Sequence, residues 1–194
     1  MNTIERAKNI ILSPKTEWLV IETEEISASK LLTSYLLLLA LIPAVCGFIG
    51  YGLVGYNVLG AHFGSIDLGF RHAATSYVSM IAGVYLTAFI INKLAPRFSS
   101  LENFDKAFQL VVYSYTPMFV AGVFYLFPSM STIAGIFGLY GLYILYIGLT
   151  PMMKTPEEKV TSYFLTSIIF LVVISLLLSI VLGAFYFQTN NIQY

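Results

Sequence analysis

Residues 163–187 read YFLTSIIFLVVISLLLSIVLGAFYF, a run without one charged side chain. A helix needs about 20 mainly apolar residues to cross the hydrocarbon core of a bilayer. Apolar residues occur all round this segment, whereas a helix on the surface of a soluble protein keeps one polar face. The run therefore predicts a membrane-spanning helix.

Four further runs of this kind precede it, at about 131–150, 107–127, 74–94 and 32–56. The whole chain of 194 residues is 58% hydrophobic and 10% charged, with a mean hydropathy of +0.81. Soluble domains carry about 25% charged residues, so this chain has too few to coat a water-soluble globule. The sequence predicts an all-α, polytopic membrane protein, a bundle of five transmembrane helices.

Lysine and arginine residues fall almost entirely on one side of the predicted membrane. Arg71 lies in the link between spans one and two, and the other nine lie on the opposite side: Arg6, Lys8, Lys15, Lys30, Lys93, Arg97, Lys106, Lys154 and Lys159. Such residues concentrate in cytoplasmic segments. We expect the N-terminus in the cytoplasm and the tail QTNNIQY outside. The N-terminus has no apolar core of signal-peptide length, so we expect no cleaved signal.

Residues 1–30 are predicted to form a separate cytoplasmic amphipathic helical segment, ahead of a membrane domain at 31–194. Apolar residues recur there at helical spacing, and Ser13 with Pro14 is typical of the start of a second helix. This helix carries Trp18, the one tryptophan of the chain. It would lie at the bilayer interface or pack on the cytoplasmic ends of the spans.

Local signals place several helix ends. Ser99 with Glu102 fits a capping box before the third span. Thr155 with Pro156 fits a cap and first helical position before the fifth. Pro96 and Pro151 lie where helices are expected to stop.

Glutamates of the N-terminal segment face the basic links of the same side. An ion pair of Glu22 with Arg97 or Lys154 would clamp this segment to the spans. Trp18 and Glu22 are therefore the candidate cytoplasmic interaction residues.

The third span holds a polar cluster of Tyr113, Ser114, Tyr115, Thr116 and Pro117. Pro117 has no N–H, and its ring crowds the carbonyl four residues earlier. Inside a membrane, neighbouring helices, hydroxyls or water must satisfy the freed carbonyl. We expect a kink whose hydroxyls face the protein interior, either as a purely structural bend or as the wall of a polar cavity.

The fourth span is rich in small residues and tyrosine. Ala134, Gly135 and Gly138 would let a neighbouring backbone approach closely. Tyr140 is a candidate for the same polar cavity, or a residue of the aromatic belt. Four glycines between residues 47 and 55 predict tight packing at the outer end of the first span.

Few residues suggest chemistry. His62, Asp67 and His72 are weak candidates for a metal site, because two histidines and a carboxylate can bind zinc or iron. The alternative is a solvated outer loop with an Asp67–Arg71 ion pair. The single Cys46 excludes an intramolecular disulfide. Ten basic residues balance ten acidic ones, so we expect no nucleic-acid partner, and no catalytic motif or cofactor site is recognisable. We expect a protein that is not an enzyme.

Three stretches resemble the Yip family, the membrane domain of Ypt/Rab-interacting proteins, in its bacterial branch. They are SPKTEWLVIETEE (13–25), LAPRFSSLENFDKAFQLVVYSYTP (94–117) and GLYGLYILYIGLTPMMKTPEEKV (138–160). The resemblance implies a five-span protein of the bacterial inner membrane with a cytoplasmic N-terminus. Eukaryotic members act in vesicle traffic and bind Rab GTPases through a longer N-terminal part. This chain has only about 30 residues there, and the resemblance implies no activity.

The sequence thus favours a non-enzymatic integral membrane protein with a membrane-organising or protein-interaction role. Its partners would be the lipid bilayer and a second copy of itself or another membrane protein. The alternative is a small transporter or channel subunit for an ion or small solute. That alternative ranks second because transport usually needs ionisable groups within the membrane, and no span has one near its centre.

Overall fold

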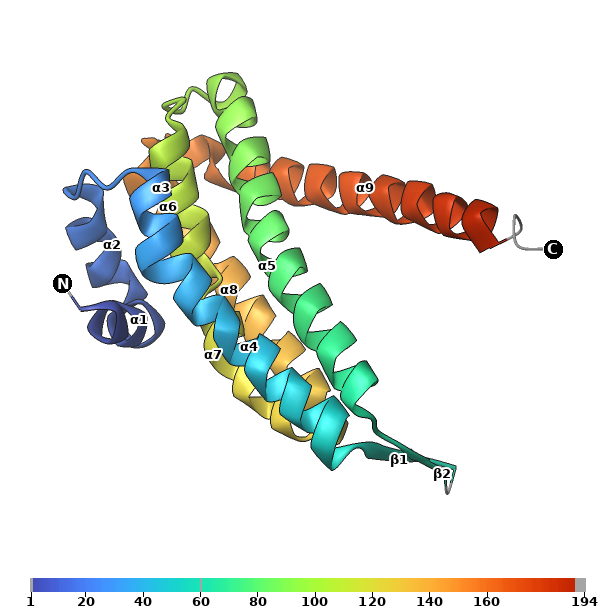
Figure 1. Cartoon of the computed structure of the whole chain (residues 1–194). Coiled ribbons are helices and arrows are strands. Elements are labelled where there is room, and N and C mark those ends of the chain that lie inside the picture. Colours follow the sequence, from blue (N-terminus) through green and yellow to red (C-terminus); the bar gives the residue numbers. More distant parts are fainter. Residues whose placement is uncertain (1, 60, 191–194) are drawn as a thin grey trace.

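The computed structural model describes residues 2–59 and 61–190, with side chains of residue 58 and of residues beyond 177 outside the description. Five helical segments are long and apolar enough to cross a membrane, and four of them run together as an elongated bundle (Figure 1). Their bounds are Ala28–Val54, Ile66–Phe98, Phe104–Leu126, Pro128–Met153 and Glu157–Leu177. The chain is an all-α, multi-pass membrane protein, as the sequence predicts.

Most spans consist of more than one helical element. The first contains α3 (Ala28–Leu31), the π-helical η1 (Leu32–Leu36), α4 (Leu37–Ile49) and the π-helical η2 (Gly50–Val54), and the second contains α5 (Ile66–Leu94) and the 3₁₀ turn η3 (Ala95–Phe98). The third contains α6 (Phe104–Ser114), α7 (Thr116–Ala121) and the 3₁₀ turn η4 (Gly122–Leu126). The 3₁₀ turn η5 (Pro128–Met130) leads into α8 (Ser131–Met153), and α9 (Glu157–Asn190) follows.

The third span is the centre of the bundle. Of its most apolar 18 residues, 72% are buried, against 17–33% in the other four spans. The fifth span is the opposite case, because α9 leaves the bundle at an angle and only its first part packs against the other helices (Figure 1). There Tyr163 stacks on Phe98 and donates a hydrogen bond of 2.5 Å to the Ile91 carbonyl. The predicted outer tail QTNNIQY extends beyond the described residues.

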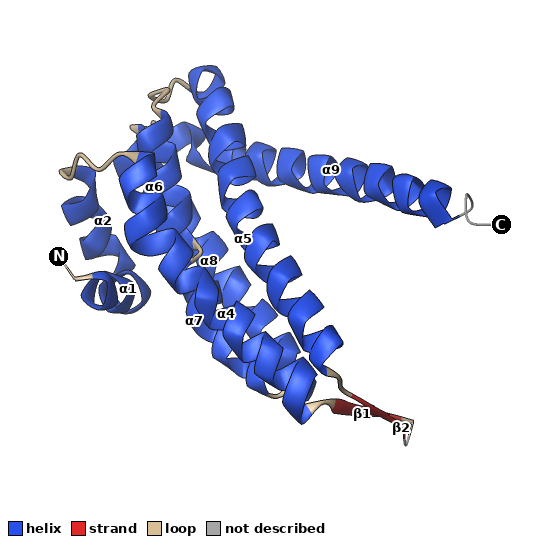
Figure 2. Ribbon diagram, viewed as in Figure 1, coloured by secondary structure: helices blue, strands red, loops and turns tan. Residues whose placement is uncertain are grey.

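Two short helices precede the first span, α1 (Thr3–Leu12) and α2 (Pro14–Glu22), which we call the N-terminal hairpin. They lie beside α6 and α8, not beyond the ends of these helices (Figure 2). Ile10 and Ile21 belong to the same hydrophobic core as the spans. The predicted division at residue 30 therefore separates two segments that share one core.

Several predicted helix ends are wrong in detail. Asn103, not Ser99, caps α6, since its side chain accepts a hydrogen bond of 3.1 Å from the Lys106 amide. Ser99 instead adopts a left-handed conformation at the end of η3. Thr155 does not cap α9, because its hydroxyl donates back to the Leu149 carbonyl of α8. Pro151 lies inside α8, which continues two residues further.

The link between the first two spans contains an antiparallel pair of strands, β1 (Tyr56–Val58) and β2 (Ala61–Phe63) (Figure 2). Helix α5 then starts at Ile66 instead of near residue 74. Ser65 caps it by accepting a hydrogen bond of 3.1 Å from the Leu68 amide. The predicted tight packing at this end of the first span is confirmed, because a Cβ on Gly50 would lie 1.9 Å from the Tyr125 carbonyl oxygen.

Candidate functional site

The third span bends where its sequence predicts a kink. Helix α6 ends at Ser114, and α7 starts at Thr116 with Pro117 in its first turn. A proline is tolerated there because the first N–H groups of a helix have no partner within it. Tyr115 lies between the two helices, and its carbonyl accepts the Phe119 amide at 3.1 Å. The break therefore falls two residues before the proline.

The hydroxyls of the kink point into the protein. Thr116 is fully buried and lies 2.9 Å from the hydroxyl of Tyr35 in the first span. The Tyr115 hydroxyl lies 3.3 Å from that of Thr87 in the second span. Ser114 donates to the Leu110 carbonyl at 2.7 Å, not to the carbonyl that Pro117 frees. The kink thus links three spans through side-chain hydroxyls.

Tyr113, the first residue of the polar cluster, is covered by the N-terminal hairpin. Its ring packs edge-on against Trp18, with ring centres 6.3 Å apart, and against Tyr35 at 5.0 Å. The guanidinium carbon of Arg6 lies 5.5 Å from the centre of the same ring. A cation over an aromatic face is stabilised by the ring quadrupole.

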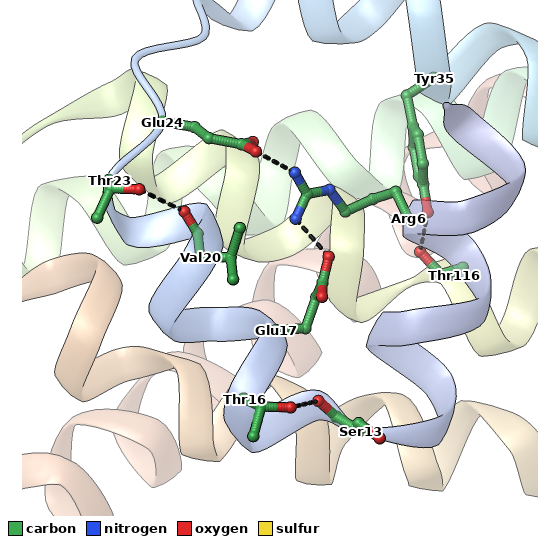
Figure 3. A network of polar contacts seen from close by, with 9 residues as sticks. All are labelled: Arg6, Ser13, Thr16, Glu17, Val20, Thr23, Glu24, Tyr35 and Thr116. Atoms are coloured by element: carbon green, nitrogen blue, oxygen red, sulfur yellow. Dashed lines mark hydrogen bonds and ion pairs between the residues drawn. The ribbon is translucent and has the colours of Figure 1, made fainter. Parts of the chain in front are cut away.

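Arg6 is the centre of a buried ion-pair cluster (Figure 3). Its Nη1 donates to Glu17 Oε1 at 2.5 Å, and its Nη2 donates to Glu24 Oε1. The side chains of Arg6 and Glu17 are only 5% and 8% exposed. The second oxygen of Glu24, Oε2, is buried without a hydrogen-bond partner among the described residues. The cluster thus retains one unused acceptor.

Trp18 joins the hairpin to the fourth span. It is 1% exposed, and its Nε1 donates to the Ile144 carbonyl at 3.1 Å. Gly148 makes room for the indole, because a Cβ there would lie 2.7 Å from it. Of the two positions that the sequence leaves open, the structure has Trp18 packed on the spans.

The segment between hairpin and first span is bound to the start of α6. Lys106 donates to the carbonyls of Glu22 and Glu24, each at 2.8 Å. The side chain of Gln109 donates to the Ile26 carbonyl at 2.6 Å. Asp105 accepts from the Ala28 amide at 2.7 Å.

The predicted clamp between the N-terminal segment and the basic links exists. The Glu22 carboxylate pairs with Lys154, one of the two partners that the sequence suggests. Both Trp18 and Glu22 thus face the molecule's own spans. They hold the hairpin against the bundle at two points.

Two cavities adjoin this region. One of about 300 Å³ lies beside the ion-pair cluster, between Arg6, Glu24, Lys30, Tyr35 and Tyr113. The other, of about 210 Å³, lies between the kink and α8, and its lining includes Ser114, Tyr115, Gly138 and Gly141. The kink therefore has features of both alternatives, because its hydroxyls form internal hydrogen bonds and Ser114 and Tyr115 also line a cavity.

Tyr140 lies apart from the polar side chains of the kink. Its hydroxyl donates to the Ile11 carbonyl at 2.7 Å, so it contacts the hairpin instead. On the same helix, Gly141 is the residue at which α8 approaches the backbone of the third span, since a Cβ there would lie 2.6 Å from the Ser114 carbonyl oxygen. Gly135 and Gly138, which the sequence favours for this contact, have no atom within 4 Å of such a Cβ.

The three candidate metal ligands are not gathered. His62 lies on β2 and contacts Asn57, while Asp67 pairs with Arg71 at 2.8 Å on the first turns of α5. His72 is held between helices, with its ring stacked on Tyr51 at 4.2 Å. Within residues 2–59 and 61–190, no group of three His, Cys, Asp or Glu side chains could hold a metal ion. The ion-pair alternative matches the observed contact.

Arg6 is the residue that sequence reasoning missed. It was counted only as a basic residue outside the membrane. A signal was present, because Arg6 precedes the apolar Ile10 by four residues and so shares its helix face. A charged residue on the apolar face of an amphipathic helix needs a buried partner, which here is Glu17.

Comparisons with known proteins agree with this architecture. The family model described as the Yip1 domain matches residues 8–180. The inner membrane protein YohC of Escherichia coli K12 is 30% identical over 122 residues, which are 59% of this chain and 60% of the relative. The same protein from E. coli O6:H1 strain CFT073 gives the same values. The matched region thus spans less than two thirds of these relatives, and no solved structure matches.

Proposed function

Because the chain belongs to the Yip1 domain family, we propose that it is a non-enzymatic, membrane-organising protein whose N-terminal hairpin acts as a wedge in one leaflet of the bilayer. The observation that carries this proposal is the position of the hairpin beside the spans, near one end of the bundle (Figure 2). At that position it would add two helices to only one half of the membrane.

The depth follows from contacts with α8. Trp18 bonds to Ile144, six residues inside the predicted membrane end of this span at residue 150, or about 9 Å at 1.5 Å per residue. Ile11 accepts from Tyr140, ten residues inside, or about 15 Å. Half of a hydrocarbon core of about 30 Å is about 15 Å. The hairpin therefore extends along most of one leaflet.

The outward face of the hairpin suits this position. Ile4, Leu12, Leu19 and Val20 are exposed, with 76%, 68%, 61% and 47% of their surface free. Exposed charges lie between them, at Glu5, Lys8 and Lys15. Long charged side chains can reach the headgroups while apolar neighbours contact the acyl chains. Such a mixture is typical of a helix at the boundary between headgroups and acyl chains, so this boundary must lie deeper beside the hairpin than elsewhere in the leaflet.

A body confined to one leaflet increases the area of that leaflet relative to the other. Lipids beside the hairpin must also shorten or tilt, because charged residues bring the interface down to its level. Both effects bend or thin the bilayer locally. The buried ion pairs and the Trp18 bond keep the hairpin in place, so the deformation would be a fixed property of the folded protein.

Spin labels at single cysteines test the depth. In a Cys46→Ser background, Leu12→Cys and Leu19→Cys place labels on the exposed face of the hairpin, and Glu25→Cys places one in the following loop. In vesicles, we expect the Leu12 and Leu19 labels to collide with oxygen more than with a water-soluble nickel complex. The Glu25 label should show the reverse.

Vesicle shape tests the consequence of that depth. Protein-loaded vesicles should be more strongly curved than matched vesicles containing a chain without residues 2–26, provided that this chain remains helical. Water exposure of the Leu12 and Leu19 labels equal to that at Glu25 would refute the wedge.

Orientation and assembly belong to the same proposal. Nine of ten basic side chains on the N-terminal side support a cytoplasmic position for the hairpin and an outer position for the C-terminus. The uncovered Gly135 and Gly138 support association of α8 with a second copy or another membrane protein. Labelling of the Glu25→Cys variant from each side of oriented vesicles tests the orientation.

A small transporter or channel subunit is the second candidate, and one observation favours it. Arg6, Glu17 and Glu24 supply charged groups at membrane depth, which no span has near its centre. They adjoin the cavity of about 300 Å³. Ion or solute uptake into vesicles that is lost in Glu24→Gln, but not in Glu25→Gln, would favour transport over the wedge.

A further inference from the structure

A cleft of about 790 Å³ lies between α2, the end of α8 and the start of α9. Ligand sites of small molecules are commonly about 300–1,000 Å³. The cleft is distinct from the ion-pair cluster, which lies on the opposite side of α2, toward α1 and α6. Neither the kink nor the Arg6 cluster contributes a residue to it.

The walls of the cleft are mainly apolar. Leu19 projects from α2, Ile147 and Pro151 from α8, and Val160 from α9, with the indole edge of Trp18 at the base. Leu19 is 61% exposed, so this part of the wall has no cover within the chain. At the depth derived from the Trp18 bond, an open apolar wall of this kind faces acyl chains, not water.

The end of the cleft near the bilayer surface is charged. Lys154 lines it together with Glu22 and Glu157. Lys154 forms an ion pair with Glu22 but stays 57% exposed, and an ammonium group has three donors, so it can also bind a phosphate oxygen. Glu157 forms no ion pair among the described residues and can accept an ammonium group. Lys15 is the remaining charged residue of the lining. The opposite charges of Lys154 and Glu157 match a zwitterionic headgroup attached to an acyl chain.

We propose that this cleft binds one phospholipid of the leaflet that contains the hairpin, with an acyl chain along Leu19 and Ile147. The phosphate contacts Lys154, and the headgroup ammonium contacts Glu157. This inference rests on the membrane depth argued for the proposed function. The bound lipid would fill the space between the hairpin and α9. It would thus add to the volume that the hairpin occupies in the same leaflet.

Trp18 provides the measurement, because it is the one tryptophan of the chain and lines the cleft. Protein in detergent micelles is titrated with phosphatidylethanolamine brominated on its acyl chain, a quencher that acts at short range. We expect saturable quenching of Trp18 emission. Unbrominated phosphatidylethanolamine should reverse it, and inorganic phosphate should not.

Two variants test the two ends of the site. Lys154→Gln removes the phosphate contact and should weaken the apparent affinity about tenfold, the effect of one charge-assisted hydrogen bond. Thr150→Phe, at an exposed position of the cleft, should fill the groove and abolish saturable quenching. Lys93→Gln is the matched control, because Lys93 also forms an exposed ion pair, with Glu102, outside the cleft.

Equal quenching of Lys154→Gln, Thr150→Phe and Lys93→Gln proteins would overturn the inference, as would displacement by inorganic phosphate. The titration is done in detergent, so its failure leaves the spin-label depths unaffected. If instead the labels were exposed to water while Trp18 quenching stayed saturable and sensitive to Lys154, the wedge would fail and the lipid site would remain.

Discussion

Two arginine–carboxylate pairs at opposite ends of the molecule show how strongly the surroundings decide the role of the same chemistry. Arg71 pairs with Asp67 on α5, and their side chains are 75% and 72% exposed. Arg6 pairs with Glu17 between α1 and α2, and their side chains are 5% and 8% exposed. The first pair lies within one helix. The second joins two helices and also contacts the third span through Tyr113.

The difference predicts that removing one partner is costly only at the buried pair. Water solvates either partner of the exposed pair when the other is removed, so such pairs contribute about 0–1 kcal/mol. A buried charge that loses its partner has no such compensation. We therefore expect the position of the hairpin to depend on Arg6 far more than the start of α5 depends on Arg71.

The largest expected effect comes from breaking the buried pair. Arg6→Met leaves Glu17 buried and unpaired, and should lower the free energy of unfolding by about 3–5 kcal/mol. Titration with sodium dodecyl sulfate in mixed micelles, followed by Trp18 emission, measures it. Adding Glu17→Leu should recover part of the loss, since apolar residues can replace a buried pair, while Glu24 stays without its partner. Additive losses in the double variant would mean that the pair itself does not determine stability.

Two glycines of α8 give the same contrast within a single helix, because Gly141 is covered by the third span and Gly138 is not. Gly141→Ala places a Cβ against the Ser114 carbonyl beside the kink, and should destabilise the protein by about 1–3 kcal/mol. Gly138→Ala meets no atom within 4 Å and should be neutral, or stabilising by up to about 1 kcal/mol. The same detergent titration compares them. Equal effects would show that α8 does not pack on the kink through Gly141.

The smallest effect is expected at the exposed pair. Asp67→Asn should change the free energy of unfolding by less than about 1 kcal/mol. The variant should also lose the small dependence of the free energy of unfolding on salt that this pair contributes. Circular dichroism during detergent unfolding, at low and high salt, measures both. A loss as large as that of Arg6→Met would contradict the distinction between the two pairs.

Much of the fold could be predicted because membrane insertion depends on local composition. Each span is an apolar run long enough for the bilayer, and the kink follows from the missing N–H of Pro117. The inward direction of Thr116 followed from the need to satisfy hydroxyls away from water. The Glu22–Lys154 pair was among the suggested ones because both residues lie on one side of the membrane.

Other features could not be predicted, because they depend on contacts between distant segments. The capping residue of α6 was missed, since Ser99 and Asn103 both precede a helix and only the path of the chain distinguishes them. Tyr140 was a candidate for the polar cavity or for the aromatic belt, yet it bonds to Ile11, 129 positions away. The position of the hairpin beside the spans was missed for the same reason, because Trp18 could bond to a span or face the interface.

By itself, the sequence determined that the chain is a multi-pass membrane protein, which five segments are long and apolar enough to cross, and where its central helix bends. These are properties of single segments in lipid, where every backbone group must be satisfied within the segment or close by. Only the tertiary structure decided that the N-terminal helices lie beside the spans with Arg6 buried between them. That arrangement depends on charges and rings from separate segments meeting in space, which no local pattern encodes.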